Sequence, residues 1–141
     1  MTLRISDCGL RKIVAHAREA APAECCGLLV GGADEIADAI RTRNIDGDKS
    51  RFQIDPKDHI DGRREARRRG LDVVGFYHSH PRSPAEPSET DVAEATYPDH
   101  FYLIVSLAAE PVDVRLFRLA GGIFHPVEYV ASGFSRTSPS A

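Results

Sequence analysis

The apolar positions of this chain follow two periods, one typical of strands and one typical of helices. Leu3 and Ile5 alternate with polar neighbours, as in a short strand, and Ser6 can then cap a helix that Pro22 ends. The apolar residues at helical spacing are Leu10, Ile13, Val14 and Ala17. The uninterrupted apolar run at 25–30 predicts a strand that is buried on both faces.

The middle of the chain predicts two further strands, at 35–44 and 50–54, and then a helix. Asp55 can cap this helix, Pro56 suits its first position, and Gly70 closes it. Arginines gather in its last turns, where the helix dipole favours cations: Arg63, Arg64, Arg67, Arg68 and Arg69. Because the net charge is -3 and no aromatic residues interleave with them, the cluster indicates a solvated face and not a nucleic-acid site.

The second half of the chain predicts a central strand at 71–77, with two histidines at or just past its end. A short helix is expected from Ser88 to Thr96. Further strands are expected at 101–107, 112–119 and 127–130. Strands interspersed with two or three helices predict an α/β fold in which helices flank a mixed sheet. We expect one domain over 1–131 and a disordered, serine-rich tail over 132–141.

Composition narrows the class of protein. A chain of 141 residues, 42% of them hydrophobic, can bury a core without disulfides. The three cysteines, Cys8, Cys25 and Cys26, contain no C-x-x-C pair, so neither a disulfide framework nor a thiolate zinc site is indicated. Cys25 and Cys26 lie in the apolar run and are expected to be buried structural thiols. No uncharged apolar run approaches the about 18 residues of a membrane span. The sequence predicts a cytoplasmic protein with protein or small-molecule partners and no nucleic-acid or membrane partner.

Three candidate metal ligands occur close together, namely His78, His80 and Asp91. In an extended segment, residues i and i+2 point to the same side, so both imidazoles can face one point. Two imidazoles, a carboxylate and a water match the ligands of a catalytic zinc. The alternatives are two surface histidines at a strand end and, for Asp91, the acidic partner of a capping box that begins at Ser88.

A zinc-activated water also needs a general base, and no helical H-E-x-x-H motif supplies one here. Glu24, at the entrance of the buried strand, and Glu86 or Glu89, in the loop before Asp91, are the candidates, and local pattern does not choose between them. The remaining histidines, expected to be ordinary surface or partly buried residues, are His16, His59, His100 and His125.

The combined pattern resembles the JAMM, or MPN-plus, metallopeptidase family. Its signature is a Glu before a buried strand, then H-x-H-P, then Ser and Asp at fixed spacing. The matching segments are Glu24-Cys25-Cys26-Gly27-Leu28-Leu29, His78-Ser79-His80-Pro81 and Pro87-Ser88-Glu89-Thr90-Asp91. The H-x-E and P-C-x-x-C signature of the deaminases with a similar architecture is absent, which disfavours base deamination.

This resemblance implies a cytidine-deaminase-like α/β fold and a role for each signature residue. Zn²⁺ would be held by His78, His80 and Asp91. Glu24 would act as the acid/base, and Ser88 would donate a hydrogen bond to the oxyanion that forms during hydrolysis.

Arg51-Phe52-Gln53-Ile54-Asp55-Pro56 and Gly75-Phe76-Tyr77-His78-Ser79-His80-Pro81 most resemble the Mec-like bacterial branch of the family. That resemblance implies a peptidase or isopeptidase that cuts after the C-terminal Gly-Gly of a ubiquitin-like sulfur-carrier protein. Two alternatives stay open: a non-catalytic MPN-type scaffold that binds partners, and a zinc hydrolase of a small-molecule amide. The carrier, the residue released and the oligomeric state are also open, a homodimer being one possibility.

Overall fold

The computed structural model describes residues 2–89, 91 and 95–132. Its elements in chain order are β1 (Leu3–Ser6), α1 (Asp7–Ala20), β2 (Cys26–Gly32), β3 (Glu35–Thr42), α2 (Pro56–Arg68), β4 (Asp72–His80), β5 (Phe101–Ser106), β6 (Asp113–Ala120), β7 (Ile123–Val127) and β8 (Tyr129–Ser132). No helix in these described ranges is long and apolar enough to span a membrane.

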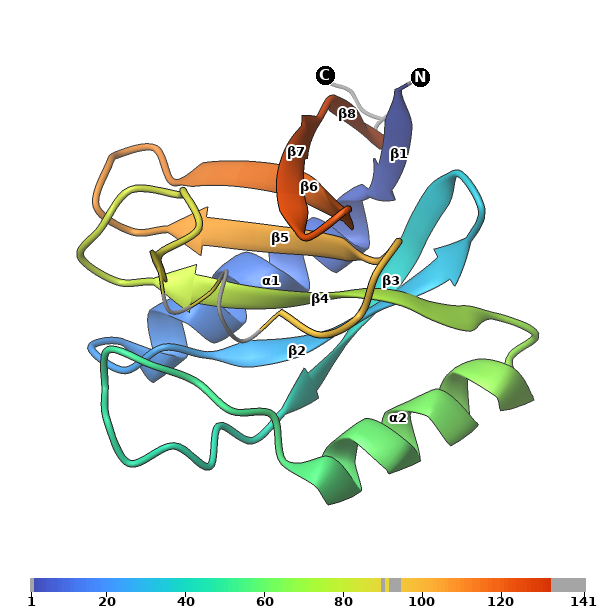
Figure 1. Ribbon diagram of the computed structural model, residues 1–141, viewed down its shortest axis with the longest axis horizontal. Coiled ribbons are helices and arrows are strands. Elements are labelled where there is room, and N and C mark those ends of the chain that lie inside the picture. Colours follow the sequence, from blue (N-terminus) through green and yellow to red (C-terminus); the bar gives the residue numbers. More distant parts are fainter. Residues whose placement is uncertain (1, 90, 92–94, 133–141) are drawn as a thin grey trace.

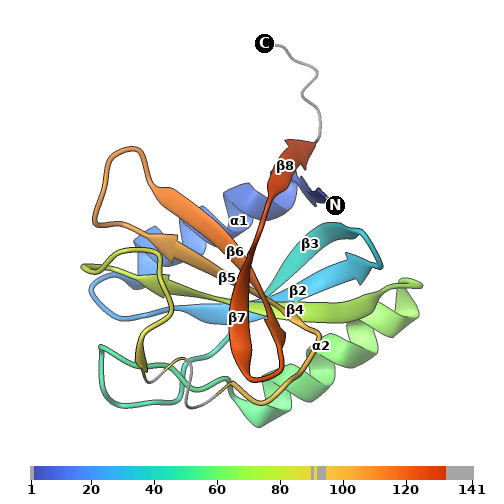
Figure 2. The same cartoon turned by 45° about the horizontal axis from the view of Figure 1, so that its top comes forward.

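The strands form one mixed sheet in the order β7-β6-β5-β4-β2-β3-β1-β8. β4 and β5 are parallel, as is β1 with both β3 and β8, whereas the remaining neighbours are antiparallel. β7 and β8 lie at opposite ends of this order, yet only Glu128 separates them in the chain. The sheet therefore curls until one continuous segment joins its two ends (Figures 1 and 2).

The two helices pack on opposite faces of the central strands (Figure 1). Ile13 and Ala17 of α1 are buried in one apolar cluster with Leu29 of β2, and Ala66 of α2 is buried in another with Leu28. Consecutive residues of β2 thus serve opposite faces, as the strand period of two requires. Because both of its faces are covered, β2 is apolar throughout, and the predicted α/β class is confirmed.

Both helix starts follow the sequence signals. The Ser6 hydroxyl accepts a hydrogen bond from the backbone N–H of Gly9 at 2.9 Å, and the Asp55 carboxylate accepts one from Lys57 at 2.9 Å. Gly70, after α2, has a positive φ of 76°, a conformation that glycine adopts without steric cost. Ion pairs of Arg68 with Glu65 and of Arg69 with Asp38 agree with a solvated arginine face.

The strand predicted at 50–54 is wrong. Only Ile54 bridges to another strand-like segment, at Asn44, and 44–55 is otherwise a loop. The Asn44 side chain organises this loop, because its Oδ1 accepts hydrogen bonds from the N–H groups of Asp46 and Gln53. A side chain that occupies backbone donors in this way competes with the pairing of a strand.

The boundaries of four other elements also differ from the prediction. The strand expected over 35–44 ends at Thr42, and β4 continues through His80, so both histidines lie inside a strand. β8 includes Ser132, one residue into the predicted tail, whereas 133–141 lie outside the described residues. Of the helix expected at 88–96, Glu89 and Asp91 are helical, 95–96 are not, and 90 and 92–94 are outside the described residues.

Candidate metal centre

β4 presents His78 and His80 on the same side of the sheet. Both rings are buried, and their Nε2 atoms lie 3.1 Å apart. Ser79, between them, points the other way, where its hydroxyl accepts a hydrogen bond from the backbone N–H of Cys25 at 2.8 Å. The alternation expected for an extended segment is therefore observed.

The loop after β4 returns Asp91 to these two rings. Its Oδ2 lies 3.1 Å from Nε2 of His78 and 3.1 Å from Nε2 of His80. The same oxygen accepts a hydrogen bond from the N–H of Ser88 at 2.9 Å, and the Asp91 N–H donates to the Ser88 hydroxyl at 3.0 Å. Asp91 thus closes a capping box and lies against both histidines, so its role in the cap does not prevent it from serving as a metal ligand.

The three side chains fit a zinc ion. Ligand atoms about 2.0 to 2.1 Å from a tetrahedral zinc lie roughly 3.3 Å from one another, close to the separations of 3.1 Å found here. Nδ1 of His80 donates to the carbonyl oxygen of Pro84 at 2.7 Å, which leaves Nε2 of a neutral ring with a lone pair. In a neutral ring that lone pair would be available to a metal ion held together with the Asp91 carboxylate.

The pKa shifts of Asp91 and His78 favour the protonation states that bind a metal, whereas the shift of His80 opposes it. Burial would raise the pKa of Asp91, but hydrogen bonds with His78 and His80 hold it well below its usual range. Burial lowers the pKa of His78, whereas at His80 burial is outweighed by Asp91 and Pro84, which raise the pKa. An anionic carboxylate and neutral imidazoles bind a metal, so a proton at His80 competes with the ion.

Glu24 lies beside this cluster because β2 pairs with β4. Cys26 is opposite His78 in the register, and the N–H of Ser79 donates to the carbonyl of Cys25 at 3.1 Å. From the other side, the Asn44 side-chain amide donates to the Glu24 carbonyl at 2.9 Å. The backbone of Glu24 is therefore held between β4 and the 44–55 loop.

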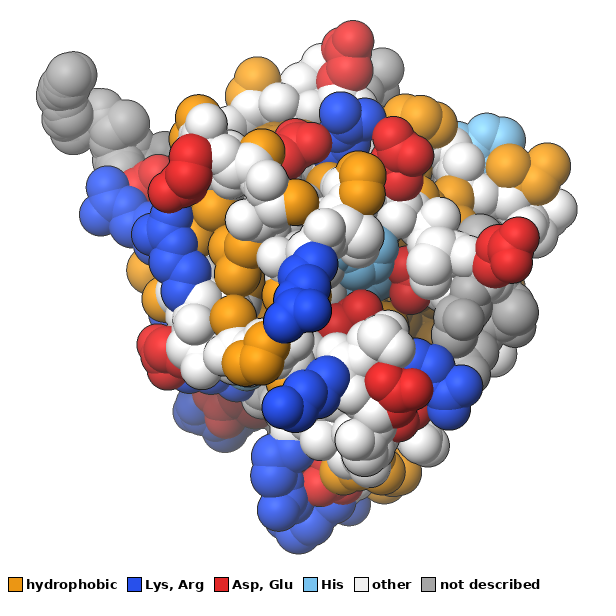
Figure 3. Space-filling view, turned by 90° about the vertical axis from the view of Figure 1, so that its left-hand side faces the viewer, with side chains coloured by type: hydrophobic (Ala, Val, Ile, Leu, Met, Phe, Trp, Pro, Cys, Tyr) orange, Lys and Arg blue, Asp and Glu red, His pale blue; other side chains and the backbone are white. Residues whose placement is uncertain are grey.

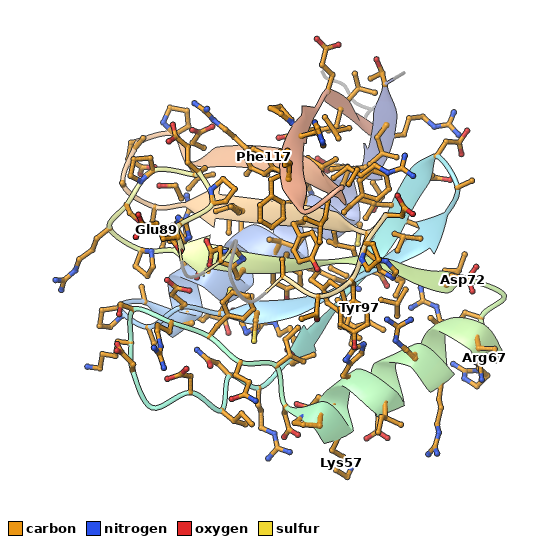
Figure 4. All side chains as sticks on the ribbon, viewed as in Figure 1. Lys57, Arg67, Asp72, Glu89, Tyr97 and Phe117 are labelled. Carbon is orange, nitrogen blue, oxygen red and sulfur yellow. The ribbon has the colours of Figure 1, made fainter. Side chains whose placement is uncertain are left out.

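The Glu24 carboxyl group is buried, and its Oε1 has no hydrogen-bond partner among the described residues. Burial raises its pKa to about 7, with smaller contributions from the charges of His80 and Asp91. Of the three candidate bases, Glu86 and Glu89 are exposed. Figure 4 shows Glu89 on the loop beyond the end of β4. The geometry therefore favours Glu24.

A cavity of about 500 Å³ opens beside the cluster and is bordered by His78 and Asp91. The end of the sheet where β4 finishes is seen in Figure 3, in which a histidine side chain is visible beside acidic side chains. The ring of Phe52, from the 44–55 loop, stacks on the His78 ring with centroids 4.4 Å apart and planes at 20°. Phe52 stands in the segment that carried the family resemblance, but no local pattern indicated this contact.

Phe52 is expected to orient His78, because its ring stacks on the His78 ring with centroids 4.4 Å apart. We expect Phe52→Ala to weaken zinc binding by about 10- to 100-fold, the usual effect of losing a group that orients a ligand. Competition with a chelator measures this affinity, and the visible spectrum of the cobalt-substituted protein reports ligand geometry. Phe52→Tyr keeps the ring and is the control; equal zinc affinity in Phe52→Ala would contradict the role.

The other sequence candidates lie away from the cluster. Cys25 and Cys26 are buried, and burial raises the pKa of these thiols to about 11 and about 12, in agreement with the structural role predicted for them. His16 is half-buried, with Nδ1 2.7 Å from the Tyr77 hydroxyl. Among the described residues, His78, His80 and Asp91 are the group of three that can hold a metal ion.

A central strand that carries two histidines, followed by a loop that returns a carboxylate to them, agrees with the signature of the JAB/MPN metallopeptidases. The chain belongs to the family described as prokaryotic homologs of the JAB domain, whose sequence model matches residues 9–120. It is accordingly a peptidase of the JAB/MPN type, and His78, His80 and Asp91 form a group that can hold its metal ion. The resemblance recognised in the sequence is confirmed.

Relatives and a solved structure agree with this family. A desampylase of Haloferax volcanii is 39% identical over 101 residues, which cover 67% of this chain and 73% of that protein. The CysO-cysteine peptidase of Mycobacterium tuberculosis is 34% identical over 114 residues, or 78% of this chain and 77% of that protein. A solution structure from Desulfitobacterium hafniense has a TM-score of 0.85 and 29% identity and covers 93% of both chains.

Proposed function

We propose that this protein hydrolyses the bond after the C-terminal Gly-Gly of a ubiquitin-like sulfur-carrier protein. The observation that carries the proposal is the convergence of His78, His80 and Asp91 beside Glu24, whose buried Oε1 has no partner among the described residues. The names of the two relatives, a desampylase and a CysO-cysteine peptidase, support hydrolysis of protein-linked substrates.

In this proposal each signature residue has one task. His78, His80 and Asp91 would hold zinc, which when bound supplies a Lewis acid that makes water nucleophilic at neutral pH. Glu24 accepts the proton of the attacking water and later returns it to the leaving amine. The Ser88 hydroxyl accepts a hydrogen bond from Asp91, so its own proton is free to be donated to the oxyanion.

The two alternatives, a non-catalytic scaffold and a small-molecule amidase, differ from this proposal in what they require. A Gly-Gly tail has no side chains, so its extended backbone can approach a buried metal closely. A scaffold needs no complete ligand set, whereas all five signature residues are present in this chain. A small-molecule amidase would not require a folded carrier.

The test is the zinc-loaded protein with a ubiquitin-like carrier extended beyond its Gly-Gly. We expect one cut directly after Gly-Gly, detected by intact mass, and a higher kcat/KM for the folded carrier than for a short Gly-Gly peptide. Equal cleavage of carrier and peptide would favour the amidase. No cleavage of either by fully loaded protein would contradict the proposal.

A further inference from the structure

Ser79 carries a buried hydroxyl next to the metal centre, and neither the family resemblance nor the proposed reaction gives it a role. It occupies the x position of the H-x-H-P segment, between His78 and His80, and it is 0% exposed. Its side chain lies on the face of β4 opposite to the two histidines, beside Cys25 of the apolar core. A hydroxyl in apolar surroundings costs free energy unless it makes hydrogen bonds, so what Ser79 binds is informative.

The Ser79 hydroxyl holds the peptide group that joins Glu24 to Cys25. It accepts a hydrogen bond from the Cys25 N–H at 2.8 Å. Because β2 begins at Cys26, opposite His78, this bond extends the pairing of β2 with β4 by one residue and uses a side chain as the acceptor. Cys25 is 2% exposed, so its N–H has little access to water as a substitute.

The other end of the same peptide group is held from the 44–55 loop. The Glu24 carbonyl accepts a hydrogen bond from Nδ2 of Asn44 at 2.9 Å, and the Glu24 N–H donates to the Lys49 carbonyl at 3.3 Å. A peptide group is planar, so a hydrogen bond at each end fixes the orientation of its plane. The direction in which the Glu24 side chain leaves the backbone is fixed with it.

The Glu24 carboxyl group depends on this backbone anchor. Its Oε1 is buried and has no hydrogen-bond partner in the described part of the chain. A general base must lie about 2.6 to 3.2 Å from the proton that it takes, and a displacement of about 1 Å can lower a rate by about 10²-fold. Nothing bonded to Oε1 restrains the carboxyl group, so its position is set through the backbone, where Ser79 acts.

Building on the proposed function, we propose that Ser79 is a positioning residue for the acid/base: through the Cys25 N–H, it aims the Glu24 side chain at the attacking water. Ser79 contributes no atom to the group of metal ligands and does not line the cavity, so it acts through Glu24 alone. Without its hydroxyl, the buried Cys25 N–H would lose its acceptor, and the peptide would turn toward another one.

The first experiment measures Ser79→Ala on a Gly-Gly-extended carrier with the zinc-loaded protein. We expect kcat to fall by about 10- to 100-fold, because the base is displaced but still present. KM and zinc affinity, the latter measured by chelator competition, should stay nearly unchanged, since the cavity and the metal ligands are kept. Ser79→Thr keeps the hydroxyl and should restore most of kcat. Ser79→Val has the shape of threonine without the hydroxyl, so the Thr–Val pair gives the same comparison if Ser79→Ala does not fold.

Tyr77→Phe is the matched control for a merely structural role. It also removes a buried hydroxyl from the same face of β4, but the partner of that hydroxyl, at 2.7 Å, is His16 of α1 and not the Glu24 segment. Both Ser79→Ala and Tyr77→Phe should lower Tm, because each loses a buried hydrogen bond. Tyr77→Phe should keep kcat. An equal loss of kcat in both variants would overturn the positioning role.

The second experiment combines Ser79→Ala with Glu24→Gln. Residues that act as a unit have non-additive effects, so Ser79→Ala should lower the residual kcat/KM of Glu24→Gln by less than about 2-fold. The same loss in both backgrounds would show that Ser79 acts independently of Glu24 and would overturn the proposal.

Hydrogen exchange of the Cys25 amide, followed by NMR, reports the anchor without any substrate. Exchange should be faster in Ser79→Ala than in the wild type and in Tyr77→Phe, because the acceptor is lost in Ser79→Ala alone. Unchanged exchange, or unchanged kcat in Ser79→Ala beside efficient wild-type cleavage, would overturn this inference and leave the proposed function intact. No cleavage by the zinc-loaded wild type would instead refute the proposed function.

Discussion

Glu24→Gln is expected to lower kcat/KM by about 10²- to 10⁴-fold, the usual contribution of a general acid/base. The amide has nearly the same shape as the carboxylate but cannot accept the proton of the attacking water. Because Glu24 contributes no ligand atom to the group of His78, His80 and Asp91, zinc content should stay the same. The measurement is kcat/KM on a Gly-Gly-extended carrier together with zinc analysis of the same preparation.

Glu86→Gln and Glu89→Gln are matched controls, because they make the same chemical change at exposed sites near the cluster. Both variants should keep most of the activity. If Glu89→Gln lost activity and Glu24→Gln kept it, the base would be in the loop and the argument from burial would be wrong.

His80→Gln is expected to remove most of the bound zinc and to lower activity by more than about 10³-fold, because one of the three proposed ligands is lost together with the hydrogen bond that it donates to the Pro84 carbonyl. Because zinc binds only the folded protein, its loss should also lower Tm. Zinc analysis, calorimetry and kcat/KM measure the three effects. His125→Gln, on the exposed strand β7, is the matched control and should leave all three unchanged.

Chelation tests the same site without mutation. Wild-type protein stripped of metal should lose activity and recover it when zinc is added back. Stripped His80→Gln should recover little activity. Full activity of the stripped wild-type protein would contradict a metal-dependent reaction.

Local sequence patterns correctly predicted the helices and strands that are specified by a few neighbouring residues. Ser6 and Asp55 cap the two helices as their positions indicated, and the apolar run at 25–30 forms the buried β2. The strand predicted at 50–54 does not form, and the Asn44 side chain, nine positions before Gln53, accepts the hydrogen bond of the Gln53 N–H. Such a contact depends on how the loop closes and leaves no periodic signal in the strand-like residues.

The sequence by itself determined which side chains are available to the centre. Alternation along β4 places His78 and His80 on one side, and the short spacing from Ser88 to Asp91 builds the capping box. Both arrangements are local, because backbone geometry sets them within a few residues. The family resemblance then named Glu24, a choice that local reasoning had left open.

Only the tertiary structure decided where these groups meet. Glu24 reaches the histidines because β2 and β4 pair in a register that sets Cys26 opposite His78, and the loop after β4 turns back to deliver Asp91. The cavity bordered by His78 and Asp91 is likewise lined by segments from Asp46 to Phe124. Contacts between residues so far apart in the chain are set by strand pairing and core packing, which act on the folded chain as a whole and leave no trace in any short stretch of sequence.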